Sequence, residues 1–99
     1  MLYAFICTDK PVEGLKLRQQ NREKHLAFLD SLGKRMKTAG PFMNEEGSEP
    51  RGSLVIIEAD SLAEAKGIAA QDPYNIAGVF ESVEVRPWKW LFGAPEGDS

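Results

Sequence analysis

The chain has 99 residues, of which 42% are hydrophobic and 27% charged, and it carries a formal net charge of −3. This length suits one domain and leaves too little interior for a deep private cavity, so a small-molecule site is expected at an edge or between subunits. The acidic balance, without a cluster of Lys and Arg, argues against a nucleic-acid partner. No apolar run approaches the ~20 residues of a membrane span.

The cysteine and histidine content restricts both cofactors and compartment. One Cys and one His exclude an internal disulfide and leave too few ligands for the usual zinc sites within one chain. We therefore expect no metal. The first ten residues lack a charged leader segment and are typical of a strand rather than a signal peptide, so we expect a cytoplasmic protein.

Four apolar segments are predicted to be strands, and two segments, one long and one short, are predicted to be helices. In chain order the predicted elements are a strand over 1–8, a helix over 13–33, strands over 36–44 and 53–59, a helix over 62–71 and a strand over 78–90. Gly33 suits the C-cap of the first helix, and Ser61 and Glu64 form a capping box at the start of the second. Pro73 ends the second helix, and Pro41 predicts an edge position or a bulge for the second strand.

The order βαββαβ is that of the ferredoxin-like split β-α-β fold, an α+β architecture with a four-stranded antiparallel sheet and two helices on one face. Its central strands are the first and third, and both are apolar on each face, over Leu2–Cys7 and Leu54–Ile57. Because no further element can cover the second face, we expect a homodimer that buries it. Aromatic residues near the C-terminus, Trp88, Trp90 and Phe92, should add to that interface. Residues 1–92 should form the domain and residues 93–99 a flexible tail.

Charged groups interrupt the inward face of the first helix. At about 100° per residue, one stripe of this helix contains Leu15, Leu26, Leu29, Leu32 and Met36. Arg18, Arg22 and His25 fall within the same stripe, although charged residues usually occupy the outer face of a helix. Either these three residues form a site, or this half of the helix overhangs the sheet so that they reach water.

Asp72 is a second interruption of the pattern. It continues the apolar stripe of the second helix and lies at its C-terminus, where the helix dipole disfavours a negative charge. The alternative is structural, because an Asp before a Pro is a common turn former. Cys7, within the first strand, is expected to be a core thiol rather than a nucleophile, and Gly52 is expected to serve bulge or turn geometry.

Five short motifs follow one another along nearly the whole chain. They are R-x-x-H-L at 22–26, T-A-G-P at 38–41, G-S at 52–53, D-P-Y at 72–74 and V-x-V-x-P-W at 83–88. Their order and spacing resemble the YciI-related (YCII domain) family over about residues 1–92. The resemblance implies a ferredoxin-like domain paired into a dimeric α+β barrel, with His25 and Asp72 as a dyad.

The implied chemistry is acid–base catalysis. An imidazole such as that of His25 can remove and return protons near neutral pH, and a carboxylate at Asp72 would fix its tautomer and stabilise the imidazolium. Arg22 could hold a substrate carboxylate, while Ser53 and Tyr74 could donate to a developing oxyanion. This set of groups requires neither metal nor organic cofactor. It suits lyase or isomerase reactions, including dehydrohalogenation, on a small anionic, ring-derived substrate.

Two other classes of function stay open. In the first, the same cleft is a non-catalytic binding site for an anionic metabolite, with Arg22 and His25 as its cationic end. In the second, the chain is a small assembly domain whose dimer interface is its function. An acidic partner for His25 favours the enzyme, because pure anion binding gains nothing from a nearby Asp72.

Overall fold

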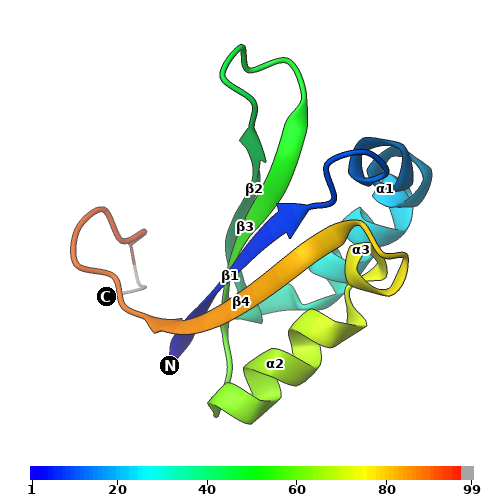
Figure 1. The fold of residues 1–99 in the computed structure, drawn as a ribbon. Coiled ribbons are helices and arrows are strands. Elements are labelled where there is room, and N and C mark those ends of the chain that lie inside the picture. The colour runs from blue at the N-terminus through cyan, green and yellow to red at the C-terminus, as the bar shows by residue number, and fades with distance from the viewer. Residues whose placement is uncertain (97–99) are drawn as a thin grey trace.

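The fold is a four-stranded antiparallel sheet with helices on one face (Figure 1), seen in a computed structural model that describes residues 1–96. The elements in chain order are β1 (Leu2–Asp9), α1 (Gly14–Ser31), a 3₁₀ turn (Gly33–Arg35), β2 (Met36–Met43), β3 (Pro50–Glu58), α2 (Leu62–Gln71), α3 (Pro73–Ile76) and β4 (Phe80–Trp88). The strand order is β2-β3-β1-β4. The predicted ferredoxin-like α+β architecture is therefore confirmed, with β1 and β3 central. Among the described residues no helix is long and apolar enough to cross a membrane.

The core lies between the sheet and the helices. Antiparallel pairing sets Tyr3 opposite Ile57 and Phe5 opposite Val55, and since alternate side chains share a face, these four point toward the helices. All four are buried, and Ile57 is 0% exposed. Residues of the helices and of the end of α1 complete the core on this face, namely Leu32, Ala65, Ile68, Ala69 and Tyr74.

Gly52 of β3 lies against the backbone of β1, which sequence reasoning did not foresee. A Cβ atom at this position would overlap the carbonyl oxygen of Cys7, so only glycine allows the two central strands to approach here. Gly52 directly precedes Ser53, which pairs with Cys7 and faces the helices. The tight strand contact therefore helps to set the position of Ser53.

The helix ends follow local sequence signals, with one addition. Ser61 caps α2 by accepting the backbone N–H of Glu64, as predicted, whereas the Glu64 carboxylate accepts from the N–H of Asp60 rather than that of Ser61. Asp72 then leaves the helical conformation for one close to polyproline II (φ −59°, ψ 126°), as a residue before proline should. The chain re-enters a helix at once with Pro73 at its first position. This short α3 was not predicted, because four residues are too few to show a helical period.

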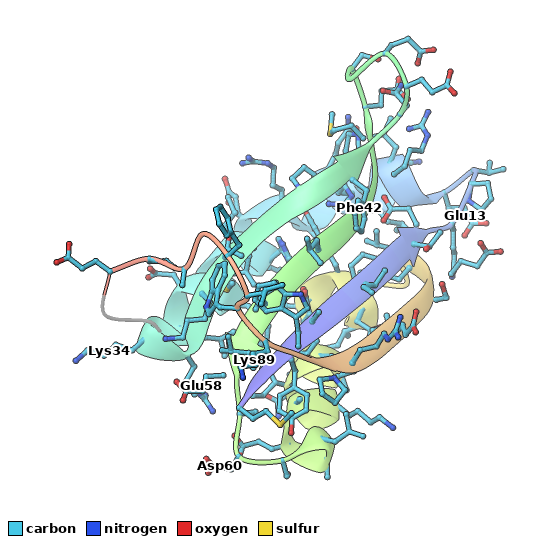
Figure 2. All side chains as sticks on the ribbon, turned by 90° about the vertical axis from the view of Figure 1, so that its left-hand side faces the viewer. Glu13, Lys34, Phe42, Glu58, Asp60 and Lys89 are labelled. Carbon is cyan, nitrogen blue, oxygen red and sulfur yellow. The ribbon has the colours of Figure 1, made fainter. Side chains whose placement is uncertain are left out.

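The second face of the sheet carries no helix (Figure 2). Ile6 and Leu54 pair across β1 and β3 on this face, and both are partly exposed. Trp88 and Trp90 pack edge to face, with ring centroids 4.8 Å apart, and the segment after β4 runs on this side of the sheet (Figure 1). Phe92 is 95% exposed.

Part of the predicted tail, residues 97–99, lies outside the described residues, so the tail stays a prediction.

Candidate active site

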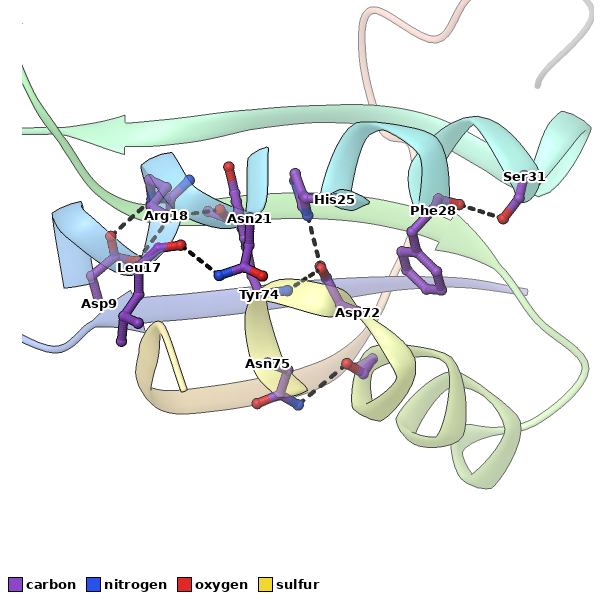
Figure 3. A network of polar contacts seen from close by, with 12 residues as sticks. Asp9, Leu17, Arg18, Asn21, His25, Phe28, Ser31, Asp72, Tyr74 and Asn75 are labelled. Carbon is purple, nitrogen blue, oxygen red and sulfur yellow. Dashed lines mark hydrogen bonds and ion pairs between the residues drawn. The ribbon is translucent and has the colours of Figure 1, made fainter. Parts of the chain in front are cut away.

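His25 of α1 and Asp72, the residue between α2 and α3, lie side by side (Figure 3). The Nδ1 atom of His25 is 2.8 Å from Oδ1 of Asp72, and both side chains are at least 90% buried. They meet because α1 packs along α3, so that the α2–α3 junction faces the middle of α1. The two interruptions noted in the sequence therefore come together in one hydrogen-bonded pair.

The hydrogen-bond pattern around Asp72 determines the tautomer of His25. Oδ1 of Asp72 also accepts the backbone N–H of Tyr74 at 2.9 Å, so it is an acceptor toward both partners. In the hydrogen bond between Asp72 and a neutral His25, the proton is therefore carried by Nδ1 of His25. The other ring nitrogen, Nε2, keeps its lone pair. Within the described residues nothing bonds to Nε2. This nitrogen is the one available as a base.

Tyr74 supports the imidazole from the side. Its ring stacks on that of His25 at 3.8 Å between centroids and 7° between planes, and it contacts Phe80 edge to face. Burial raises the pKa of the Tyr74 hydroxyl, although Arg18 and Arg22 act in the opposite direction. A raised pKa keeps the hydroxyl protonated at neutral pH, so Tyr74 can donate a hydrogen bond.

Arg18, two turns before His25, is buried rather than directed into bulk water. It is 7% exposed, and its Nε and Nη2 atoms bind the two carboxylate oxygens of Asp9 at 2.9 and 2.8 Å. Nη2 also donates to Oγ of Ser53 at 3.0 Å. The alternative that this half of α1 overhangs the sheet is therefore wrong for Arg18 and for the buried His25. Of the three charged or imidazole side chains in this stripe of α1, only that of Arg22 is exposed.

The Asp9–Arg18 pair was not predicted, although the sequence contains a signal for it. Asp9 ends an apolar strand and Arg18 interrupts an apolar helical stripe, so both side chains are expected to face the interior rather than solvent. Their approach requires Gly14 at the start of α1, where a Cβ would come within 2.9 Å of the Cβ of Asp9. Burial of such a pair is tolerated only with nearly complete hydrogen bonding, which the two bonds to Asp9 and the one to Ser53 provide.

A cavity of about 310 Å³ opens between α1 and the strands β2 and β3. This is the lower end of the range for small-molecule sites. Its apolar walls are Leu15, Leu26, Leu29, Ala39, Pro41, Pro50 and Val55, and its polar lining is Arg18, Gln19, Arg22, His25, Ser53 and Tyr74. Of the residues predicted for the site, His25, Arg22, Ser53 and Tyr74 line the cavity. Asp72 lies behind His25 and does not.

The cationic groups of the cavity differ in how they are paired. Arg18 is neutralised by Asp9, whereas no ion pair to the described residues is seen for Arg22, which lies on the exposed side of the lining. Arg22 is therefore the group that can bind a ligand anion directly.

Cys7 does not line the cavity. Cys7 is 4% exposed in the core, and burial, with Asp72 adding to it, raises the pKa of its thiol to about 12. The thiol is thus protonated at neutral pH and is not a nucleophile, in line with the expected packing role. Among residues 1–96, no group of three His, Cys, Asp or Glu side chains could hold a metal ion.

Known proteins resemble this chain over most of its length. The family model described as YCII-related domain matches residues 1–89. Protein YciI of Escherichia coli is 40% identical over 99 residues, covering 93% of this chain and all of that protein. An uncharacterized protein of Bacillus subtilis, YjpA, is 40% identical over 90 residues, covering 89% of this chain and 96% of its own.

A solved structure extends the likeness to three dimensions. The 5-chloro-2-hydroxyhydroquinone dehydrochlorinase TftG of Burkholderia phenoliruptrix, in complex with 2,5-dihydroxybenzoquinone, has a TM-score of 0.81 and 31% sequence identity. The match covers 90% of this chain and 94% of that protein. A NIPSNAP family protein of Agrobacterium tumefaciens, with 20% identity and a TM-score of 0.52, shares the fold alone.

Proposed function

We propose that this chain, which belongs to the YCII-related domain family, is a small cofactor-independent enzyme that moves protons on a ring-derived, acidic organic substrate. The observation that carries the proposal is the buried His25–Asp72 hydrogen bond of 2.8 Å at the wall of a mostly apolar cavity. A buried carboxylate behind an imidazole directs its other nitrogen toward a ligand and stabilises the imidazolium once formed. A site for anion binding alone would gain nothing from this negative charge.

The other lining groups suit a flat substrate with oxygen substituents. Aliphatic side chains and prolines can contact the ring, while Ser53 and Tyr74 can donate to its oxygens. Arg22 can form a charge-assisted bond to a carboxylate or phenolate at the open side. These roles are proposals for residues that line the cavity, and they place the negative charge of the substrate near Arg22 and the mobile proton near His25.

Elimination of hydrogen chloride from a chlorinated hydroquinone is the reaction we propose to test. The protein TftG, whose structure this chain resembles, is named for such a reaction. A proton first moves from a ring hydroxyl to the carbon that carries chlorine, which converts that hydroxyl to a ketone. His25 then removes a second hydroxyl proton, the electrons shift through the conjugated ring, and chloride leaves. The products are a hydroxyquinone and HCl, and no electron acceptor is consumed.

The direct experiment measures chloride release from 5-chloro-2-hydroxyhydroquinone under anaerobic conditions, with the quinone followed by its absorbance. We expect release well above the rate in buffer containing heat-denatured protein. Binding of the compound without any faster release would refute the enzymatic proposal. That result would favour the non-catalytic binding site, with Arg22 as its main anchor.

We also propose that the chain forms a homodimer through the open face of the sheet. Ile6 and Leu54 lie on this face without a helix over them, and contiguous apolar surface of this kind usually marks an interface. The resemblance of the sequence motifs to the YCII family likewise implies a dimeric α+β barrel.

Light scattering at micromolar concentration should give twice the chain mass of 11.0 kDa. Leu54→Asp should shift the protein to the monomer, because it places a charge within the buried interface. The matched control is Val12→Asp, since Val12 is 88% exposed in the turn after β1, and this variant should stay dimeric. A parent protein that is a stable monomer would contradict the proposal.

A further inference from the structure

The guanidinium of Arg18, at the wall of the cavity, contacts several of the other site residues. One guanidinium binds Asp9 through two hydrogen bonds and Ser53 through a third. The same guanidinium lies 4.8 Å from the centre of the Tyr74 ring, and Tyr74 in turn stacks on His25. A single cation thus contacts three other residues around the site, and its ion pair with Asp9 can be seen in Figure 3.

The bond to Ser53 restricts what the serine hydroxyl can do. A guanidinium has only donors, so Oγ of Ser53 must accept from Arg18. The single hydroxyl proton of Ser53 is then directed elsewhere, and no described residue accepts it. Since Ser53 lines the cavity, that proton is available to an oxygen of a bound ligand. The adjacent positive charge also strengthens Ser53 as a donor.

The contact with Tyr74 restricts the imidazole. A planar guanidinium packs well against an aromatic ring, and the side chain of Arg18 cannot shift without breaking its two bonds to Asp9. Tyr74 is therefore held from one side by Arg18 while it stacks on His25. Because the charge of Arg18 is already neutralised by Asp9, Arg18 is not itself the anchor of an anionic ligand.

We infer that Arg18 is a positioning residue, which makes Ser53 a dedicated hydrogen-bond donor to the substrate and holds Tyr74 against His25. This inference deepens the proposed function and rests on it for the identity of the ligand. It predicts that the site requires the geometry of the guanidinium, and that a positive charge alone at this position is not enough.

The test uses Arg18→Lys, which keeps the charge but loses the planar two-bond contact with Asp9. The probe is 2,5-dihydroxybenzoquinone, titrated by its absorbance. We expect Arg18→Lys and Ser53→Ala each to weaken binding about tenfold, the cost of one well-placed hydrogen bond. The double variant should be little weaker than either single one, because both changes remove the same donor. Arg22→Gln should weaken binding independently and add to the effect of Ser53→Ala.

A second measurement needs no ligand. The ring protons of His25 should show an upfield NMR shift from the stacked Tyr74 ring, and this shift should shrink in Arg18→Lys. Parent-like binding in either Arg18→Lys or Ser53→Ala would overturn the inference. If Arg18→Lys does not fold, the binding measured for Ser53→Ala still provides the test. Absence of probe binding to the parent would equally defeat the role of Ser53. If binding and NMR behave as expected but no chloride is released, the positioning role holds and the proposed elimination is wrong.

Discussion

Replacement of His25 by alanine is expected to lower the rate of chloride release at least about 100-fold, the lower bound for loss of a general acid–base residue. His25 is the cavity residue with a carboxylate behind its ring, through the 2.8 Å bond to Asp72. Without it, no described side chain in the cavity combines a free lone pair with a group that stabilises the resulting cation. The rate is measured under single-turnover conditions, so that product release does not mask the chemical step.

The matched control for His25→Ala is Gln19→Ala. Gln19 is an exposed residue of the same helix and lines the same cavity, yet it has no acid–base chemistry. This variant should retain a rate close to that of the parent protein. An equal loss in both variants would mean that cavity shape, and not proton transfer by His25, governs the rate.

Substitutions at Asp72 separate its two effects on His25. In Asp72→Asn, the N–H of Tyr74 still requires an acceptor at Oδ1, so the amide oxygen should keep its place and His25 should keep its proton on Nδ1. The neutral amide stabilises an imidazolium less, so the rate should fall. Asp72→Ala should lose the tautomer preference as well. Long-range ¹H–¹⁵N NMR spectra distinguish the two tautomers, and an unchanged spectrum in Asp72→Ala would contradict the assigned role.

The sequence predicted the fold well because its signals were local. Alternating apolar residues, the Ser61 cap and the Pro73 stop each act within a few residues, and together they gave the βαββαβ order. The family resemblance, drawn from five motifs, was confirmed by the match over residues 1–89. Element ends were less accurate, since β3 begins at Pro50 rather than 53, where pairing with Met43 extends the strand.

Helical periodicity indicated His25 and Asp72 because each interrupts an apolar stripe. It could not indicate their distance, which depends on how α1 packs against the α2–α3 junction. The Asp9–Arg18 pair was missed for the same reason, since its two halves come from a strand end and a helix face. Hydrophobic periodicity is read within a single helix or strand. It shows that a charged side chain faces inward, but it does not show which side chain of another element pairs with it.

Replacement of Asp9 by asparagine is expected to lower the free energy of unfolding by about 3–5 kcal/mol, the usual cost of leaving one member of a buried ion pair without its partner. The side chains of Arg18 and Asp9 are 8% and 3% exposed, so water cannot replace the lost carboxylate. Urea denaturation measures the change.

Two further variants decide whether the lost charge causes this effect. Adding Arg18→Met to Asp9→Asn removes the orphaned cation, and because an apolar replacement for a buried ion pair is often neutral, the double variant should be more stable than Asp9→Asn alone. The surface control is Glu49→Gln, which breaks the 2.9 Å ion pair with Arg51, where both side chains are nearly half exposed. Such pairs contribute about 0–1 kcal/mol. If Asp9→Asn costs no more than Glu49→Gln, then the Asp9–Arg18 pair does not hold the site together.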